Sequence, residues 1–101
     1  MAVAFILTFP HDHRDVLKEY DRVNAIMHAV AEPPHGLIFH WSAKTSSGDL
    51  RVVDVWESQE AFDRFMAEKL GPALAEVTLP APVVEALEVY NTIEGRVPSK
   101  S

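Results

Sequence analysis

The sequence predicts an α+β protein in which one antiparallel sheet is covered on one face by two helices. Strand-like and helix-like hydrophobic patterns alternate in the order β-α-β-β-α-β, and only five residues separate the two middle strands. With 101 residues the chain is expected to form one domain, over residues 1–94. Residues 95–101 are expected to form a flexible tail.

The first half of the chain predicts a strand and then a helix. Residues 2–9 are almost all apolar and stop at Pro10, as in a strand buried on both faces. From residue 12 to about residue 30 the apolar residues recur at gaps of three and four, which indicates an amphipathic helix. Residues 32–36 contain two prolines and are therefore expected to form a loop.

The second half predicts a hairpin, a helix and a last strand. Residues 36–44 and 50–57 are strand-like, and Gly and Asp in the short connection are typical of a hairpin. Ser58 is a suitable N-cap for the second helix, which we expect Gly71-Pro72 to break. Residues 83–93 are expected to form the last strand. The inward side chains of the second helix are predicted to be Phe62, Phe65, Met66 and Leu70.

This order of elements is the signature of the ferredoxin-like arrangement, with both helices on one face of the sheet. The first strand is apolar at nearly every position, so the other face of the sheet also carries apolar side chains. An apolar patch of that kind usually marks an interface. We therefore expect a two-fold homodimer in which two sheets face each other.

Composition excludes several classes of partner and site. The net charge is −6 and no cluster of Lys or Arg occurs, so nucleic acid and anionic membrane are not expected partners. The absence of cysteine excludes disulfides and thiolate chemistry. The apolar opening segment is too short to span a bilayer, and we expect a cytoplasmic protein.

One motif resembles a known family. Trp56-Glu57-Ser58 followed by Glu60-Ala61-Phe62 resembles the W-E-S-x-E-A-F signature of the dimeric α+β barrel superfamily, and most closely its antibiotic biosynthesis monooxygenase-like group. The likeness extends from the first strand to residues 88–91, and the segments GLIFHW, DVWES and Gly71-Pro72 are most similar to short bacterial members. The members include quinone-forming oxygenases, haem-degrading oxygenases, lactone isomerases and proteins without known activity, so the resemblance implies a fold more than an activity.

Two features of the sequence separate it from the haem-degrading members. Those members carry an Asn on the first strand and a Trp and a His on the second helix. Here Thr8 is the one polar residue of the first strand, Phe65 stands where the resemblance would place the Trp, and no His follows His40. We therefore expect no haem and no other cofactor. The cofactor-free members, by resemblance, hold their substrate with Trp, Asn, Tyr or Arg in a pocket between sheet and helices.

Asp54 lies inside an otherwise apolar strand, where a carboxylate must be paired, hydrogen-bonded or neutral. A three-residue hairpin loop would place His40 opposite Asp54 or Trp56, whereas a loop of two or four would place Trp41 opposite Asp54. The first register allows a His40–Asp54 pair to act as a general base or substrate anchor. The alternative is that Asp54 is a structural acid at a strand end or dimer seam.

Other residues are candidates for holding a ligand. Trp56 is able to stack on a planar molecule. Tyr20, Asn24 and His28 follow one another at helical spacing, at the edge of the apolar stripe of the first helix. Tyr90 and its neighbour Asn91 point to opposite faces of the last strand, so at most one of them enters the pocket.

His11-Asp12-His13 has the composition of a metal site, but residues two apart do not share a helix face. No further ligand is near in sequence, so no metal site is expected, and Asp12 or His13 is a candidate helix cap.

The sequence thus favours a small cofactor-free monooxygenase that acts on a hydrophobic aromatic or polyketide-type molecule, with His40 and Asp54 as its base pair. The alternatives are an isomerase or cyclase on a similar substrate and a non-catalytic homodimer that binds a small ligand.

Overall fold

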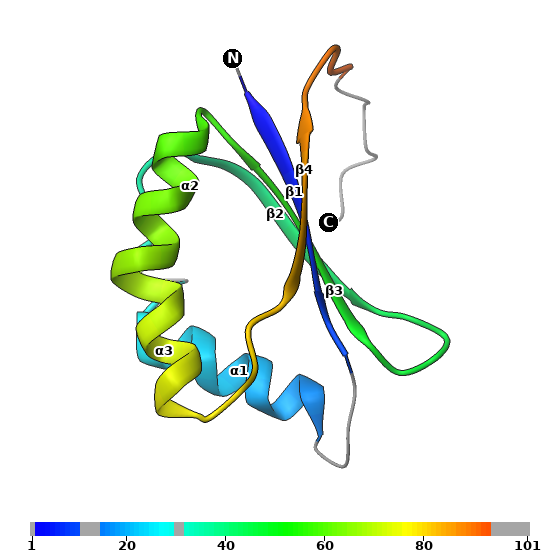
Figure 1. Ribbon diagram of the computed structural model, residues 1–101, viewed down its shortest axis with the longest axis vertical. Coiled ribbons are helices and arrows are strands. Elements are labelled where there is room, and N and C mark those ends of the chain that lie inside the picture. The colour runs from blue at the N-terminus through cyan, green and yellow to red at the C-terminus, as the bar shows by residue number, and fades with distance from the viewer. Residues whose placement is uncertain (1, 11–14, 30–31, 94–101) are drawn as a thin grey trace, which may run out of the picture.

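The computed structural model describes residues 2–10, 15–29 and 32–93. Its four strands are β1 (Val3–Phe9), β2 (Leu37–Lys44), β3 (Leu50–Trp56) and β4 (Val83–Glu88). They form one antiparallel sheet in the order β2-β3-β1-β4. The helices all lie on one face of this sheet (Figure 1). The predicted ferredoxin-like α+β fold is confirmed.

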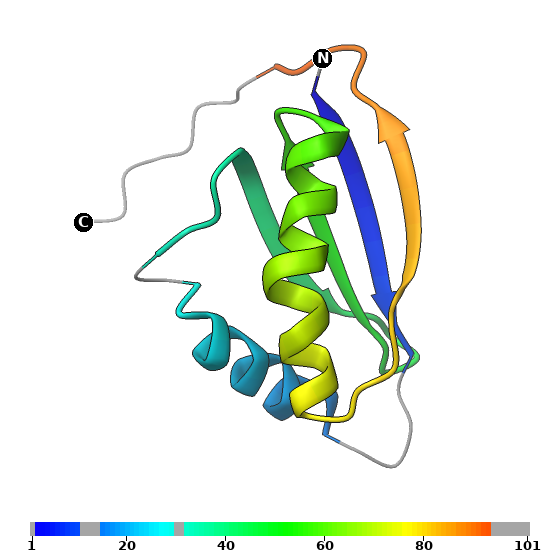
Figure 2. The same ribbon diagram turned by 60° about the vertical axis from the view of Figure 1, so that its left-hand side comes forward.

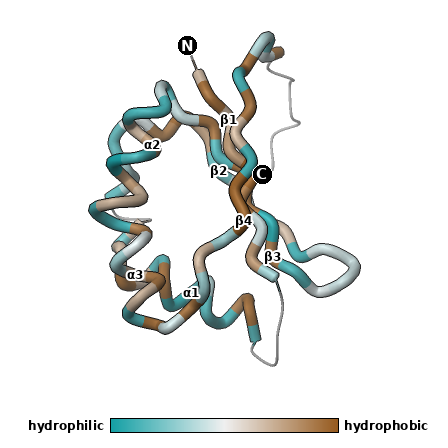
Figure 3. Tube along the Cα trace, viewed as in Figure 1, coloured by the Kyte–Doolittle hydropathy of each residue, from teal (hydrophilic) through white to brown (hydrophobic). Residues whose placement is uncertain are grey.

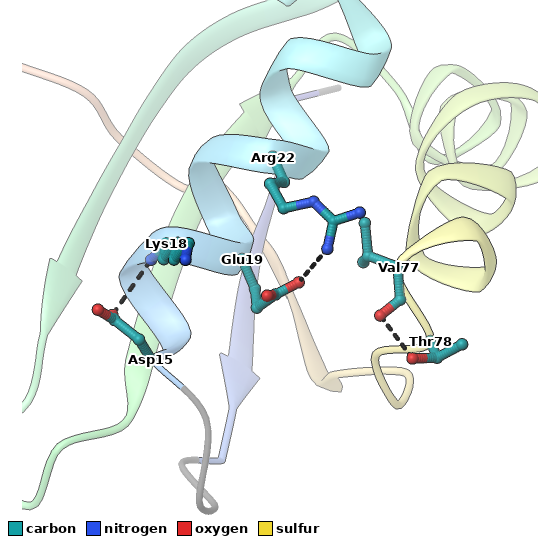
Figure 4. Close-up of polar contacts among 6 residues, drawn as sticks. All are labelled: Asp15, Lys18, Glu19, Arg22, Val77 and Thr78. Atoms are coloured by element: carbon teal, nitrogen blue, oxygen red, sulfur yellow. Dashed lines mark hydrogen bonds and ion pairs between the residues drawn. The ribbon is translucent and has the colours of Figure 1, made fainter.

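Helix α1 (Val16–Met27) is shorter than its hydrophobic pattern predicted. Asp15 has an extended backbone, and its carboxylate accepts a hydrogen bond from the Lys18 amide at 3.2 Å (Figure 4). Asp15 is therefore the N-cap, not Asp12 or His13, because its side chain satisfies an amide that the first turn leaves free. Residues 11–14, which include the His11-Asp12-His13 motif, lie outside the described residues. One turn further on, Glu19 pairs with Arg22 at 3.3 Å (Figure 4).

The second helical region is continuous, and the expected break at Gly71-Pro72 is wrong. It consists of α2 (Gln59–Phe65), a π-helical segment η1 (Met66–Leu70) and α3 (Gly71–Glu76), which follow one another as one rod (Figure 2). The Gly71 amide donates to the Met66 carbonyl, five residues back. This wide turn gives the ring of Pro72 the room that an α-helical turn denies it. A Cβ at Gly71 would lie 2.7 Å from the Met66 oxygen, which explains why glycine precedes the proline.

Ser58 caps α2 as predicted: its hydroxyl accepts from the Ala61 amide at 3.1 Å. The helix is held to the sheet by aromatic packing, since the rings of Phe5 and Phe62 stack with centroids 3.7 Å apart. Phe5, Leu7 and Trp56 are the largest fully buried side chains among the described residues. The core thus lies between the two central strands and the helices.

The last strand is shorter than expected. β4 pairs with β1. The last hydrogen bond of this pairing runs from the Val89 amide to the Ala2 carbonyl, at 3.1 Å. Because β1 offers no further partner in the described part of the chain, the backbone leaves the sheet before residue 93. Tyr90 is consequently exposed over its whole surface.

The face of the sheet that the helices leave uncovered is called the open face here. Strand residues that lie directly opposite each other share a face. Several open-face side chains are large, apolar and exposed; Trp41 and Phe39, for example, have exposed fractions of 44% and 51%. Figure 3 shows hydrophobic residues, in brown, along the strands. By register the open face comprises Ala4, Ile6, Thr8, Phe39, Trp41, Ala43, Arg51, Val53, Val55, Val83, Glu85 and Leu87.

In the described part of the chain, every helix is too short or too polar to cross a membrane.

Candidate functional site

The β2–β3 hairpin decides where the candidate base pair lies. Thr45 and Asp49 close the connection, since the Thr45 amide donates a hydrogen bond to the Asp49 carbonyl at 2.7 Å. The loop between them has three residues and ends at Gly48, whose φ of 97° favours glycine. This register places His40 directly opposite Asp54, and Trp41 lies opposite Val53 instead. Of the two predicted registers, the one that pairs His40 with Asp54 is therefore correct.

Asp54 is only 4% exposed, yet both of its oxygens have partners. His40 Nδ1 lies 2.6 Å from Oδ1, and the Trp56 indole N–H donates to Oδ2 at 3.2 Å. An ionised carboxylate only accepts, so Nδ1 carries the hydrogen of the short bond. Asp54 is thus tolerated in an apolar strand because two neighbours on the same face of the sheet donate to it.

The other ring nitrogen of His40 meets helix α1. The Tyr20 hydroxyl lies 2.8 Å from His40 Nε2, and the two rings are parallel within 1°. Asn24 and Ser42 also interact with the Tyr20 side chain and lower its pKa. The sequence indicated Tyr20 and Asn24 separately but missed their contact with His40. It missed Ser42 as well, although Ser42 follows His40 by two residues and so shares its face of the strand.

The electrostatics of this chain favour a charged imidazole. The hydrogen bond to Asp54 raises the pKa of His40 from 6.5 to about 9, and the Tyr20 hydroxyl adds to this effect, while partial burial opposes it. His40 is therefore an imidazolium at neutral pH. Burial raises the pKa of Tyr20, but hydrogen bonding to Ser42, Asn24 and His40 and the charge of His40 outweigh it. The pKa of Tyr20 thus falls below its ordinary value of 10.

A cavity of about 230 Å³ lies between the sheet and the helices, with Tyr20 and His40 at its polar end. Among the described residues that line it, Tyr20, Asn24, His40 and Asp54 have polar side chains, and Trp56 adds an indole N–H. The rest of the wall is apolar or aromatic and comes from the sheet, from α1, α2, η1 and α3, and from the segments that follow α1 and α3. These residues are Leu7, Phe9, Val16, Val23, Met27, Ala29, Pro34, Leu37, Leu50, Val52, Trp56, Phe65, Leu70, Leu74 and Leu79.

The structure places five of the seven predicted site residues at this cavity and two elsewhere. His28 is exposed and ends α1 in the left-handed conformation, where its side chain does not line the cavity. Tyr90 lies beyond the end of β4 and is fully exposed. The expectation that they join the cavity is corrected because α1 and β4 both end before these positions.

Trp56 lines the cavity in a different way from the one expected. It is 0% exposed, and its ring packs against Phe62 and Phe65 with centroids 6.0 and 5.0 Å away. Its N–H is committed to Asp54. In this structure Trp56 therefore holds the carboxylate in place and does not present a free ring face to a ligand.

Replacing Trp56 with phenylalanine is expected to lower the free energy of unfolding. The substitution leaves Asp54 Oδ2 buried without a donor, which costs about 1–3 kcal/mol. Urea unfolding of the two proteins, with the slope held equal, measures the difference. The Phe65→Leu variant is the control, since it alters the same packing but no hydrogen bond; an equal loss in both variants would contradict a role for the indole N–H.

In the described part of the chain, no group of three His, Asp or Glu side chains lies close enough to hold a metal ion. His11, Asp12 and His13 lie outside that part.

The fold and the cavity together define a ferredoxin-like α+β protein with a small, mostly apolar site that has one charged end. No family model and no curated protein matches the sequence. Solved structures do match, and they include antibiotic biosynthesis monooxygenase-like proteins, which agrees with the resemblance of the W-E-S-x-E-A-F motif.

Three of these structures illustrate the likeness. Rv0793 from Mycobacterium tuberculosis superimposes with a TM-score of 0.73 at 16% identity, over 93% of this chain and 100% of that chain. SnoaB, a cofactor-independent oxygenase from Streptomyces nogalater, gives 0.68 at 16% identity, over 93% and 98%. The ActVA-Orf6 monooxygenase of Streptomyces coelicolor, in complex with Nanaomycin D, gives 0.64 at 20% identity, over 94% and 93%. At these identities the likeness establishes the fold.

Proposed function

We propose that the protein is a small monooxygenase that needs no cofactor and oxidises a hydrophobic aromatic molecule of the polyketide type. The observation that carries this proposal is the Asp54–His40–Tyr20 chain at the polar end of an apolar cavity. A carboxylate that orients an imidazole is the usual arrangement of a general base. The proposal is further supported by the fold shared with SnoaB and ActVA-Orf6, which are described as oxygenases.

In the proposed reaction, the neutral imidazole of His40 removes a proton from an acidic phenol or enol, and Asp54 holds the ring and stabilises the imidazolium. The electron-rich carbanion then forms a carbon–oxygen bond with O₂. The resulting peroxide takes a proton, and loss of water converts the substrate CH₂ group into a carbonyl. The carbon supplies all four electrons that reduce O₂ to one carbonyl oxygen and one water, so the step needs no external reductant.

The pH dependence of oxygen consumption tests this proposal. The base must be deprotonated, and the pKa of His40 is raised to about 9, so kcat/KM is expected to rise about tenfold per pH unit up to that value and then level off. The measurement is O₂ uptake and carbonyl product across a panel of phenols, naphthols and their keto forms from pH 6 to 10. No uptake with any of them, or a profile that falls with rising pH, would contradict the proposal.

We also propose that two copies pair through their open faces, which would remove Trp41, Phe39 and the apolar centre of the sheet from water. Burial of apolar surface is favourable by about 25 cal/mol per Å², so covering these side chains would favour association. Glu85 lies beside Ile6 on that face and must meet a polar group of the partner or remain at the rim.

Replacing Trp41 with glutamate is expected to convert the dimer into a monomer, because it places a charge within an apolar interface. Sedimentation velocity at micromolar concentration measures the change. Leu17→Glu is the matched control, since Leu17 is 42% exposed on α1, away from the open face. A wild-type protein that already sediments as a monomer would contradict the proposed pairing.

A further inference from the structure

We propose that the cavity selects an aromatic molecule of one or two fused rings and binds its single acidic hydroxyl, as the anion, on the Tyr20 hydroxyl. This inference names the substrate class of the site described above and rests on the proposed function for its location. It is carried by two independent features, the size of the cavity and the direction of the hydrogen bonds at its polar end.

The cavity volume limits the number of rings. An apolar protein cavity of about 150 Å³ binds one benzene molecule, and sites for drug-sized ligands begin at about 300 Å³. The volume of about 230 Å³ found here lies between these two. A volume of this size matches one or two fused rings better than three. The wall is almost entirely apolar, so the ligand must also be apolar over most of its surface.

The hydrogen-bond chain at the polar end runs in one direction. Asp54 accepts from His40 Nδ1, and the Trp56 indole satisfies its second oxygen. When His40 is an imidazolium, its Nε2–H donates to the Tyr20 oxygen, which lies 2.8 Å away. The Tyr20 proton is then directed away from His40, so a ligand is able to accept it in competition with Asn24 and Ser42, which also interact with this hydroxyl.

This direction favours an anionic oxygen on the ligand. Each donor in the chain polarises the next, so the Tyr20 hydroxyl is a stronger donor than an isolated phenol. Asp54 from β3 and Tyr20 from α1 are the titratable groups that contact His40, and Asp54 and His40 neutralise each other. A phenolate therefore meets a neutral ion pair with a polarised donor in front of it. When His40 is neutral instead, deprotonation of a neutral phenol leads to the same state, because Tyr20 is able to pass the proton on to His40.

The probe for the charge state is 4-nitrophenol, whose phenolate absorbs visible light and whose neutral form does not. Addition of the protein at a pH below the pKa of 4-nitrophenol is expected to increase phenolate absorbance, with the pKa of the bound probe lowered by about 1–3 units. The Tyr20→Phe variant keeps the ring and should bind the phenolate about 10- to 100-fold more weakly. Its affinity for 4-nitroanisole, which has no acidic proton, should be unchanged. Binding of neutral 4-nitrophenol only, or equal binding by Tyr20→Phe, would overturn the inference.

The size limit is tested with hydroxylated aromatics of one, two and three fused rings. Phenol and 2-naphthol derivatives should bind, and hydroxyanthracene at least tenfold more weakly. Leu74→Ala enlarges the cavity on the side of α3 and should restore binding of the three-ring compound. If the wild type binds the three-ring compound more tightly than the two-ring compound, the inference is overturned. If the protein also oxidises the three-ring compound, the proposed function still stands. Phenolate binding without oxygen consumption would contradict the proposed function alone.

Discussion

Replacing His40 with asparagine is expected to lower kcat/KM for oxygen-dependent turnover by about 10²–10⁴-fold, the usual contribution of a general base. The asparagine amide is able to donate to Asp54 from the position of Nδ1, so the buried carboxylate keeps its partner and the fold is retained. The amide cannot take up a proton, and the contact with Tyr20 is lost. Stopped-flow oxygen consumption under single-turnover conditions measures the effect on the chemical step.

His28→Asn is the matched control for this substitution. His28 is exposed, does not line the cavity and adopts the left-handed conformation that asparagine tolerates. Its turnover should equal that of the wild type. If His40→Asn also retains full turnover while binding the same substrate, His40 is not the base, and the site only holds its ligand.

Replacing Asp54 with asparagine is expected to lower kcat/KM by a similar factor for a different reason. The Trp56 N–H lies against Oδ2 and requires an acceptor there. The asparagine must therefore turn its oxygen to Trp56 and its NH₂ group to His40. Nδ1 then has to accept, which moves the imidazole proton to Nε2 and removes the lone pair that faces Tyr20.

The pKa of His40 reports this change directly. Asp54 is the largest cause of its elevation, so in Asp54→Asn the pKa of His40 should fall from about 9 toward 6.5. NMR titration of the imidazole Cε1–H signal measures it. In the wild type, the raised pKa of His40 adds to the free energy of unfolding. This contribution is fully present below pH 6.5 and disappears as the pH rises through about 9. In Asp54→Asn, the free energy of unfolding should not decrease in this pH range for that reason.

A double variant separates orientation from charge. In Trp56→Phe the donor that fixes the orientation of the introduced asparagine is absent, so the amide oxygen of that side chain is free to accept from His40 again. The loss of activity in Asp54→Asn combined with Trp56→Phe should then be smaller than the product of the two single losses. Strict multiplication of the two losses would show that Trp56 does not control the tautomer of His40.

The hydrophobic pattern predicted the fold closely, while element ends were less accurate. Asp15, not Asp12 or His13, starts α1, because capping depends on the backbone conformation of one residue. Gly71-Pro72 was expected to end a helix, yet the π-helical turn before it removes the steric conflict. The last strand stops early because its partner does, which depends on pairing between segments about eighty residues apart.

The order of the elements, the apolar faces of the sheet and the presence of one acid within a buried strand could all be read from the sequence, because they follow from the spacing and chemistry of neighbouring residues. The contacts of Asp54 with His40 and Trp56, and of Tyr20 from α1 with the same imidazole, became evident only from the arrangement of the elements in space. A shift of one residue in the hairpin would have turned His40 to the open face. Hydrogen bonds across separate elements are fixed by register and helix placement, which local sequence pattern does not encode.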